Sequence, residues 1–170
     1  MSARMSRRLV VRAALALACV VVPAVAAPIN DTPGAPADQY ETFDRTSLIV
    51  TDAKTRLVWA RVVTQQATFA QTTDACTNRF ELLAGRRLPS VKELLTLVDE
   101  YPHDVYENGR ELKRAIDQQA FDGGQFTTPT DKPYWTSTPA GPNRYWVVDF
   151  ATGETTTRAV GEAAHVRCVR

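Results

Sequence analysis

The sequence predicts an α+β domain, in which helices are separated along the chain from an antiparallel sheet. Three observations lead to this class. β-branched and aromatic residues in short alternating runs occupy residues 47–62 and reappear after Pro133. Between these two regions, apolar residues recur every three or four positions, which is the period of an amphipathic helix. No internal repeat or long low-complexity segment is present in the sequence.

The first 26 residues have the layout of a secretory signal peptide. Arginines precede or interrupt an apolar run that ends in Ala24-Val25-Ala26, so we expect cleavage before Ala27 and a secreted or periplasmic protein. A membrane anchor is the weaker alternative. Arg12 and Pro23 bracket only ten apolar residues, whereas a membrane span needs about 20.

Removal of this segment changes the charge and the cysteine count. The chain has 20 Lys and Arg against 19 Asp and Glu, and residues 1–26 hold four of the arginines, so the mature net charge is −3. Because no basic stripe remains, we do not expect nucleic acid as a partner. Lipid attachment at Cys19 stays open as an alternative, although Ala16-Leu17-Ala18 is a poor lipobox. Otherwise Cys76 and Cys168 remain in an oxidising compartment, where one disulfide is the economical inference.

The mature chain divides into a tether and a single domain. Residues 27–42 contain Pro and Asp without apolar periodicity, so we expect an exposed, flexible linker. Residues 43–170 have the length of one domain that can bury a core of its own.

Two strands and a helix are expected first. Residues 47–62 read as two short strands around a polar turn at Asp52 to Thr55. The apolar residues that follow recur at steps of four, three, four and three, which predicts a helix that stops near Gly85. The buried face of this helix would consist of Phe69, Thr73, Cys76, Phe80 and Leu83.

A second helix has a clearer start. Ser90 and Glu93 form an S-x-x-E capping box, and Pro102 ends the helix. Its apolar stripe, at the spacing i, i+3, i+4 and i+7, consists of Val91, Leu94, Leu95 and Val98. A short third helix is expected around residues 111–121, from the positions of Leu112, Ala115 and Ile116.

Alternation sorts the side chains of the C-terminal strands. Trp146, Val148 and Phe150 should point to one face, and Tyr145, Val147 and Asp149 to the other. Residues 151–154 reverse the chain, and a final strand places Val166 and Cys168 on a common face. We expect Trp59, Trp135 and Trp146 to serve mainly in packing.

Six ordered motifs give the chain a resemblance to a known family. They are VTDAKTRLVWAR, GRRLPSVKELLTLVD, AIDQQAF, YWTST, WVVDFATG and VRCVR. Together they resemble the Lcl C-terminal domain family over residues 48–170. The resemblance implies a C-type-lectin-like fold, with antiparallel strands, paired N- and C-terminal strands, two main helices and long loops. It also implies an extracytoplasmic location and an adhesive or ligand-binding role. Arg56 replaces a common Gly of the family, and Arg86 replaces a common Trp.

The lectin-like resemblance does not by itself predict a calcium-dependent sugar site, because function belongs to the site rather than the scaffold. Gly141-Pro142-Asn143 lacks the carboxylate or amide that true C-type lectins place before the proline, and Val147 follows Trp146. Calcium needs six to eight oxygen ligands. We therefore expect no cofactor and no metal. The alternative, a structural calcium, would be held by Asp131, Asn143, Asp149 and Glu154.

We expect no catalytic activity. The sequence has no G-x-S-x-G, H-E-x-x-H or C-x-x-C motif. His103 beside Asp104 is typical of a solvated loop, and His165 of a packing residue in the last strand. A sulfatase-modifying type of enzyme, similar in topology, is the enzymatic alternative. Such enzymes use a reactive cysteine pair, whereas Cys76 and Cys168 are expected to form a staple.

The prediction for function is a secreted or envelope-associated module that binds a glycan or protein ligand. A structural docking domain of an envelope assembly is the alternative. Ligand sites concentrate on long loops carried by rigid scaffolds. We expect the loops 122–133 and 139–144 to emerge close together, because they flank one strand. The candidate ligand-binding residues are Phe126, Thr128, Asp131, Asn143, Tyr145 and Asp149.

Overall fold

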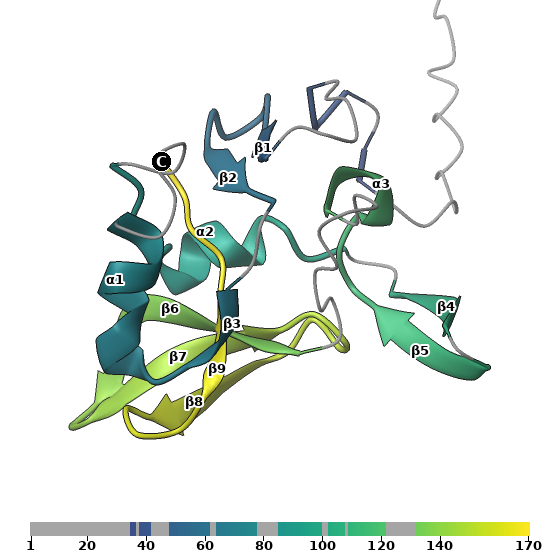
Figure 1. Cartoon of the computed structure of the whole chain (residues 1–170). Helices are drawn as coiled ribbons and strands as arrows, with labels where there is room; N and C mark the ends of the chain where they lie inside the picture. The colour runs from purple at the N-terminus through teal and green to yellow at the C-terminus, as the bar shows by residue number, and fades with distance from the viewer. Residues whose placement is uncertain are drawn as a thin grey trace, which may run out of the picture. The chain divides into compact units, whose positions relative to one another are not determined.

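The computed structural model describes residues 35–36, 38–41, 48–61, 64–77, 85–99, 102–107, 109–121 and 132–170. These residues form a mixed α+β domain with more strand than helix, as predicted (Figure 1). The strands are β1 (Ile49–Thr51), β2 (Val58–Ala60), β3 (Thr64–Ala67), β4 (His103–Glu107), β5 (Arg110–Arg114), β6 (Pro133–Gly141), β7 (Arg144–Asp149), β8 (Thr155–Ala159) and β9 (Ala164–Val166). The helical elements are the 3-10 helix η1 (Phe69–Gln71) and the α-helices α1 (Thr72–Thr77), α2 (Val91–Leu95) and α3 (Gln118–Phe121). No helix in the described part of the chain is long and apolar enough to cross a membrane.

Five strands make the main sheet, in the order β3-β9-β6-β7-β8. Neighbours pair antiparallel except β9 and β6, which are parallel where Tyr134 pairs with His165. The prediction of an antiparallel sheet is therefore wrong for this one pair. The difference arises because the chain crosses back from the edge strand β8 and enters between β3 and β6. The pairs β1–β2 and β4–β5 form two separate two-stranded sheets.

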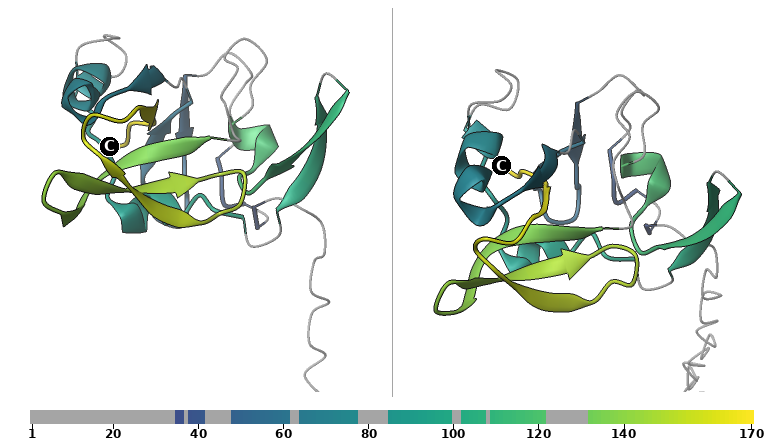
Figure 2. Two further views of the ribbon diagram at one scale, coloured as in Figure 1. Left: turned by 90° about the horizontal axis from the view of Figure 1, so that it is seen from below. Right: turned by 60° about the horizontal axis from the view of Figure 1, so that its bottom comes forward.

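Both faces of the central strands are buried. Tyr134, Val148 and Phe150 belong to one hydrophobic cluster, together with Leu94 of α2. Trp135 and Val147, which alternate with them along β6 and β7, belong to a second cluster that includes Cys76 of α1. The predicted alternation is thus confirmed, and each face has its own helix, as the views in Figure 2 show.

Main-chain hydrogen bonds join strand β2, near the start of the domain, to the last residues of the chain. The Val58 and Arg170 main chains exchange hydrogen bonds of 2.9 and 3.0 Å, and the Ala60 N–H donates to the Cys168 carbonyl at 2.8 Å. Arg87 and Val169 exchange a further pair, both 2.9 Å. The last residues therefore lie between β2 and the segment before α2.

Part of the segment predicted as a tether contacts the domain. The Ala35 N–H donates to Asp117 Oδ2 at 3.0 Å. Tyr40 forms a β-bridge with Asp52, and its ring packs edge-on against Phe121 with centroids 5.2 Å apart. Packing of the domain therefore includes residues that precede 43.

The first predicted helix is described as far as Thr77. It begins as η1 and continues as α1, and Cys76 is buried as expected. Thr72 rather than Thr73 is the buried threonine, because its hydroxyl donates back to the Phe69 carbonyl at 2.8 Å. The other two residues of the expected face, Phe80 and Leu83, lie outside the described residues.

The second helix begins where predicted, and both halves of its Ser90–Glu93 capping box are present. The expected buried face is wrong at one position: Leu95 is 38% exposed, and Leu97 is buried instead. After Leu95 the chain tightens into i→i−3 hydrogen bonds, among them Leu97 N–H to the Leu94 carbonyl at 3.2 Å. Three residues per turn place Leu94 and Leu97 on one face.

The third helix is shorter than predicted. Only Gln118–Phe121 are helical, while Arg110–Arg114 form β5, which pairs with β4 from His103↔Arg114 to Glu107↔Arg110. The hairpin extends away from the five-stranded sheet in Figure 1. The sequence between the two strands, Asn-Gly, favours two-residue hairpin turns, and Gly109 has φ 76°. His103 is thus a strand residue rather than a loop residue.

Candidate ligand-binding surface

The candidate ligand residues that the structure describes do not all lie together. Phe126, Thr128 and Asp131 lie outside the described residues. Asn143 and Tyr145 lie at the β6–β7 hairpin end, whereas Asp149 pairs with Pro133 at the opposite end of the two strands. The eight residue steps along β6 span roughly 26 Å. The strand ends that carry the two expected loops therefore lie apart, and residues 122–131 of the first loop lie outside the described residues.

Asp149 has a local structural role. Its Oδ1 accepts a hydrogen bond from the Ala151 N–H at 2.8 Å, and its main-chain carbonyl accepts from the Gly153 N–H at 2.7 Å. These bonds close the turn between β7 and β8. Gly153 has φ 77°, and a Cβ there would lie 2.9 Å from Val98 Cγ1, so the turn needs glycine.

Asn143 is exposed at the tip of the opposite hairpin. Its φ of 54° lies in the left-handed region, which Asn tolerates better than most residues. The Asn143 carbonyl accepts from the Val160 N–H at 3.0 Å, which ties the hairpin tip to the turn after β8. The side-chain amide is thus held on a fixed turn and faces solvent.

Tyr145 stacks on a residue from a distant part of the chain. The Tyr145 and Phe69 ring centroids are 3.5 Å apart with an interplanar angle of 17°. Phe69 also packs edge-on against the buried Trp135 at 5.6 Å, and Trp135 Nε1 donates to the Ala67 carbonyl at 2.7 Å. Tyr145 and Phe69 are both half-buried. The stacked pair therefore packs on Trp135 on one side and is partly exposed to solvent.

We call Phe69, Tyr145 and Asn143 the aromatic surface. The spacing of apolar residues predicted a core position for Phe69, whereas the structure places this ring half-buried against Tyr145. Thr68 and Gln71 form a capping box that starts η1 directly before Phe69. That T-x-x-Q pattern was the available signal that Phe69 occupies the first turn rather than the middle of a helix.

Arginines beside the aromatic surface are held by neighbouring groups. Arg144 Nη2 donates to the Thr157 carbonyl at 2.7 Å, and its Nε donates to Thr157 Oγ1 at 3.1 Å. Arg158, which pairs with Tyr145 across the strands, donates to the Ala163 carbonyl at 2.6 Å. Arg158 therefore shares the face of Tyr145, whereas Arg144 alternates with Tyr145 along β7 and lies on the other face of the sheet.

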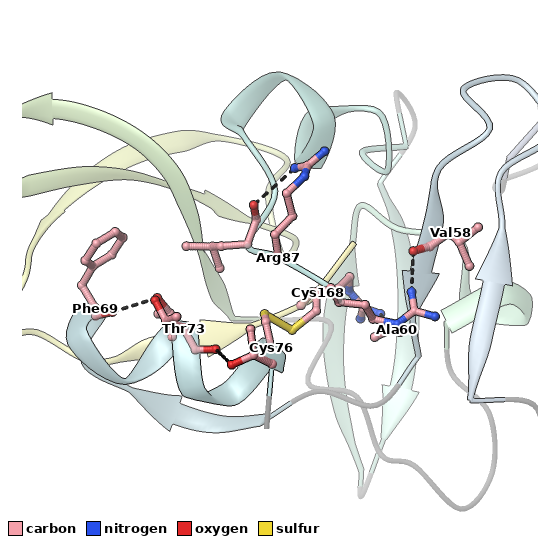
Figure 3. Close-up of a disulfide and its surroundings, with 12 residues drawn as sticks. Val58, Ala60, Phe69, Thr73, Cys76, Arg87 and Cys168 are labelled. Atoms are coloured by element: carbon pink, nitrogen blue, oxygen red, sulfur yellow. Dashed lines mark hydrogen bonds between the residues drawn. A yellow bond between two sulfur atoms is a disulfide. The ribbon is translucent and has the colours of Figure 1, made fainter. Parts of the chain in front are cut away.

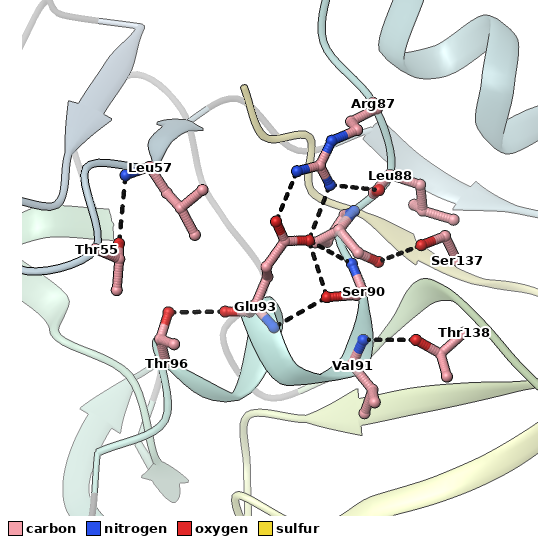
Figure 4. A network of polar contacts seen from close by, with 11 residues as sticks. Thr55, Leu57, Arg87, Leu88, Ser90, Val91, Glu93, Thr96, Ser137 and Thr138 are labelled. Atoms are coloured by element: carbon pink, nitrogen blue, oxygen red, sulfur yellow. Dashed lines mark hydrogen bonds and ion pairs between the residues drawn. The ribbon is translucent and has the colours of Figure 1, made fainter.

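The start of α2 carries a polar network, drawn in Figure 4. Arg87 donates through both terminal nitrogens to Glu93, at 2.8 and 2.6 Å, and the Ser90 N–H donates to Glu93 Oε2 at 2.8 Å. The hydrogen bonds from Arg87, followed by those from Ser90, lower the pKa of Glu93 to about 2 despite partial desolvation. The Val91 N–H donates to Thr138 Oγ1 at 2.9 Å, which joins the helix to β6.

Cys76 and Cys168 form a disulfide, as predicted (Figure 3). Their Cα atoms are 5.5 Å apart, and the bond joins α1 to the C-terminal segment across 92 residues of sequence. The two cysteines are 1% and 2% exposed. The bond therefore lies in the second hydrophobic cluster and not at the surface.

The residues considered above for acid–base chemistry or metal binding contact other parts of the fold. His165 is buried, with its ring centroid 5.5 Å from that of Tyr134. Asp104 forms a cross-strand ion pair with Lys113 at 3.1 Å. Among the described residues, no group of three or more His, Cys, Asp or Glu side chains could hold a metal ion. Asn143 and Asp149, two of the four possible calcium ligands, lie at opposite ends of β7.

Both departures from the family pattern are accommodated. Arg56 takes φ 61°, so the turn keeps the left-handed residue that glycine would supply. Arg86 is buried, and its Nη1 donates to the Val58 carbonyl at 2.7 Å, where the family commonly has an aromatic ring.

We compared the sequence with models of known protein families and with curated proteins. The model of the Lcl C-terminal domain matches residues 48–170, which include all nine strands described above. A search of curated proteins finds no match. The matched region covers well over half of the sequence, and the chain therefore belongs to the Lcl C-terminal domain family.

Proposed function

We propose that this protein is an exported, non-catalytic module with a C-type-lectin-like fold that binds a glycan or protein ligand. The observation that carries the proposal is the aromatic surface, in which stacked Phe69 and Tyr145 rings are anchored on Trp135 beside the exposed Asn143 amide. Aromatic rings offer apolar area with little entropy to lose, and a neighbouring amide adds directional hydrogen bonds.

The disulfide supports the non-catalytic part of the proposal. A sulfatase-modifying type of reaction needs an accessible cysteine pair, but Cys76 and Cys168 are bonded to each other in the core. His165 is likewise enclosed. The two residue types best suited to nucleophilic or acid–base chemistry are thus engaged in packing at these positions.

A docking role in an envelope assembly is the second candidate, and the β4–β5 hairpin favours it. This hairpin stands apart from the main sheet in both views of Figure 2. Its described side chains include exposed Asp104, Arg110, Glu111 and Lys113. Such a charged arm could contact a partner without involving the aromatic surface.

The test is a screen of the purified protein against glycan and protein arrays, followed by affinity measurements on any ligand found. We expect Tyr145→Ala and Phe69→Ala each to weaken binding about three- to tenfold, from the energy of an aromatic contact. Lys92→Ala, an exposed position of α2, should leave the affinity unchanged.

Melting temperatures separate lost contacts from lost folding. If a ligand binds equally well to both ring variants but is lost on Lys113→Ala in the hairpin, the docking role replaces the proposal. Affinity lost only in step with stability would also count against the aromatic surface.

A further inference from the structure

The β4–β5 hairpin is a two-stranded sheet of its own. Among the described strands, β4 and β5 pair only with each other, in a register that runs from His103↔Arg114 to Glu107↔Arg110. The hairpin stands apart from the main sheet in Figure 1 and in both views of Figure 2. An isolated two-stranded hairpin is at best marginally stable in water, and further strands stabilise it. Each of these strands has one edge without a neighbouring strand in the described part of the chain.

The sequence of β4 is complementary to itself in charge. The strand reads His-Asp-Val-Tyr-Glu from residue 103 to residue 107. Antiparallel pairing with a second copy, centred on Val105, places His103 opposite Glu107 and Asp104 opposite Tyr106. Like charges directly opposite each other destabilise a sheet, and this register creates no such pair. The charges of β4 therefore allow it to pair with β4 of another molecule.

The same register extends an apolar row. Val105 pairs with Leu112 within the hairpin. Leu112 is half-buried, and it lies between the exposed residues Glu111 and Lys113. Paired residues share one face of a sheet, so two hairpins joined at β4 carry the continuous row Leu112, Val105, Val105, Leu112 across four strands. Each hairpin alone has half of this row, and joining the halves removes apolar surface from water.

The edge of β5 is less suited to self-pairing. The same operation centred on Leu112 places Arg110 opposite Arg114 at both ends, which sets like charges against each other. Arg114 is also buried. The next residue, Ala115, donates its N–H to the Phe150 carbonyl at 2.6 Å, so β5 is the strand that ties the hairpin to the main sheet.

We propose that β4 of one molecule pairs with β4 of a second copy. The two hairpins then form one antiparallel four-stranded sheet with a two-fold axis at Val105. Such an interface is isologous, because each copy contributes the same strand. It uses no residue of the aromatic surface, so the proposal stands independently of the ligand. Two linked surfaces bind a multivalent ligand more tightly than one surface does.

Sedimentation equilibrium of the purified protein over a range of concentrations measures the association. Two short strands make a small interface, which is typical of weak complexes. The series therefore extends to about 1 mM, which covers dissociation constants in the upper micromolar range. We expect a monomer–dimer equilibrium. A protein that stays monomeric over the whole series overturns the proposal.

Charge pairing at the axis tests the register. Val105→Lys and Val105→Glu each set like charges against each other on the two-fold axis, and each should weaken dimerisation at least tenfold. Mixed in equal amounts, the two variants set opposite charges there and should form the dimer again. Leu112→Lys and Leu112→Glu are the matched control on the neighbouring strand, and mixing them should give no more dimer than either variant alone. Recovery with the Leu112 pair instead of the Val105 pair would place the junction on β5 and overturn the proposal.

A covalent link tests the same contact without a charged substitution. Directly opposed residues of antiparallel strands have Cα atoms about 4.5–5.5 Å apart, which a disulfide can join. With oxidised glutathione as the oxidant, Val105→Cys should give a covalent dimer and Leu112→Cys should not. The native Cys76–Cys168 bond is buried in both variants. This measurement decides if the charged variants melt at a lower temperature than the parent. Equal linkage at the two positions would contradict pairing through β4.

Discussion

Arg56 holds a backbone conformation that glycine adopts at lower cost. It follows the turn that Asp52 closes, and its φ is 61°. A left-handed conformation costs an L-residue about 1–2 kcal/mol, and glycine does not pay this cost. Glycine also makes the unfolded chain more flexible, which offsets part of the gain. We expect Arg56→Gly to stabilise the domain by about 0.5–1 kcal/mol in urea unfolding. Lys54→Gly, in the same turn but without positive φ, should give no gain, and an equal gain in both variants would contradict this account.

Glu93 makes stability depend on pH. Its pKa falls from 4.5 to about 2 in the folded protein, chiefly through Arg87. A lowered carboxyl pKa stabilises the fold above pH 4.5, and the contribution is lost as the pH falls from 4.5 towards 2. Because the pair is partly exposed, solvent screening limits the effect to about 1 kcal/mol. Unfolding free energies of the protein and of Glu93→Gln should differ at pH 6 and converge near pH 2. A constant difference would assign the loss to packing.

Among the elements, α2 shows what local sequence determines. The Ser90–Glu93 box depends on side chains three positions apart, so it was predicted correctly. The burial of Leu97 instead of Leu95 depends on where the helix tightens, and that is set by contacts with β6 and β7. By contrast, the Asn108-Gly109 signal for the β4–β5 hairpin was present in the sequence, but Leu112, Ala115 and Ile116 suggested a helix.

The edge strand β8 is protected against pairing with another chain. Its outward main-chain groups are covered in part by two side chains: Arg144 donates to the Thr157 carbonyl at 2.7 Å, and Glu162 Oε2 accepts from the Ala159 N–H at 2.6 Å. Exposed edges otherwise recruit further strands. We therefore expect Arg144→Ala combined with Glu162→Ala to self-associate at concentrations where the unmodified protein does not.

Sedimentation velocity over a range of protein concentrations measures this self-association. Thr155→Pro, added to the double variant, should reverse it, since proline removes a main-chain donor from the open part of the edge. If the double variant stays as monodisperse as the parent, the two side chains do not guard β8.

At the scale of the whole molecule, the aromatic surface lay beyond sequence reasoning. Alternation correctly placed Tyr145 on the face of Val147. It could not reveal that Phe69, 76 residues earlier in the numbering, stacks on that ring, because no local pattern encodes a contact between η1 and β7. The expectation that residues 122–133 and 139–144 emerge close together took adjacency in sequence as adjacency in space, although the nine-residue strand β6 separates the two strand ends.

The disulfide, in contrast, could be predicted from the sequence. Its removal tests how the C-terminal segment is held to the rest of the domain. Cys76 and Cys168 close a loop of 92 residues, which in the chain-entropy model stabilises the fold by at most about 4–5 kcal/mol. The bond also anchors the last segment, whose Val169 main chain pairs with Arg87. We expect the double variant Cys76→Ser/Cys168→Ser to lose roughly 2–4 kcal/mol and to show faster amide exchange at Val169 than at Val148 in the sheet centre. Thr73→Ser, an exposed change in α1, is the control. Unchanged stability in the double variant, or exchange that rises equally at both sites, would show that the strands alone hold the C-terminal segment in place.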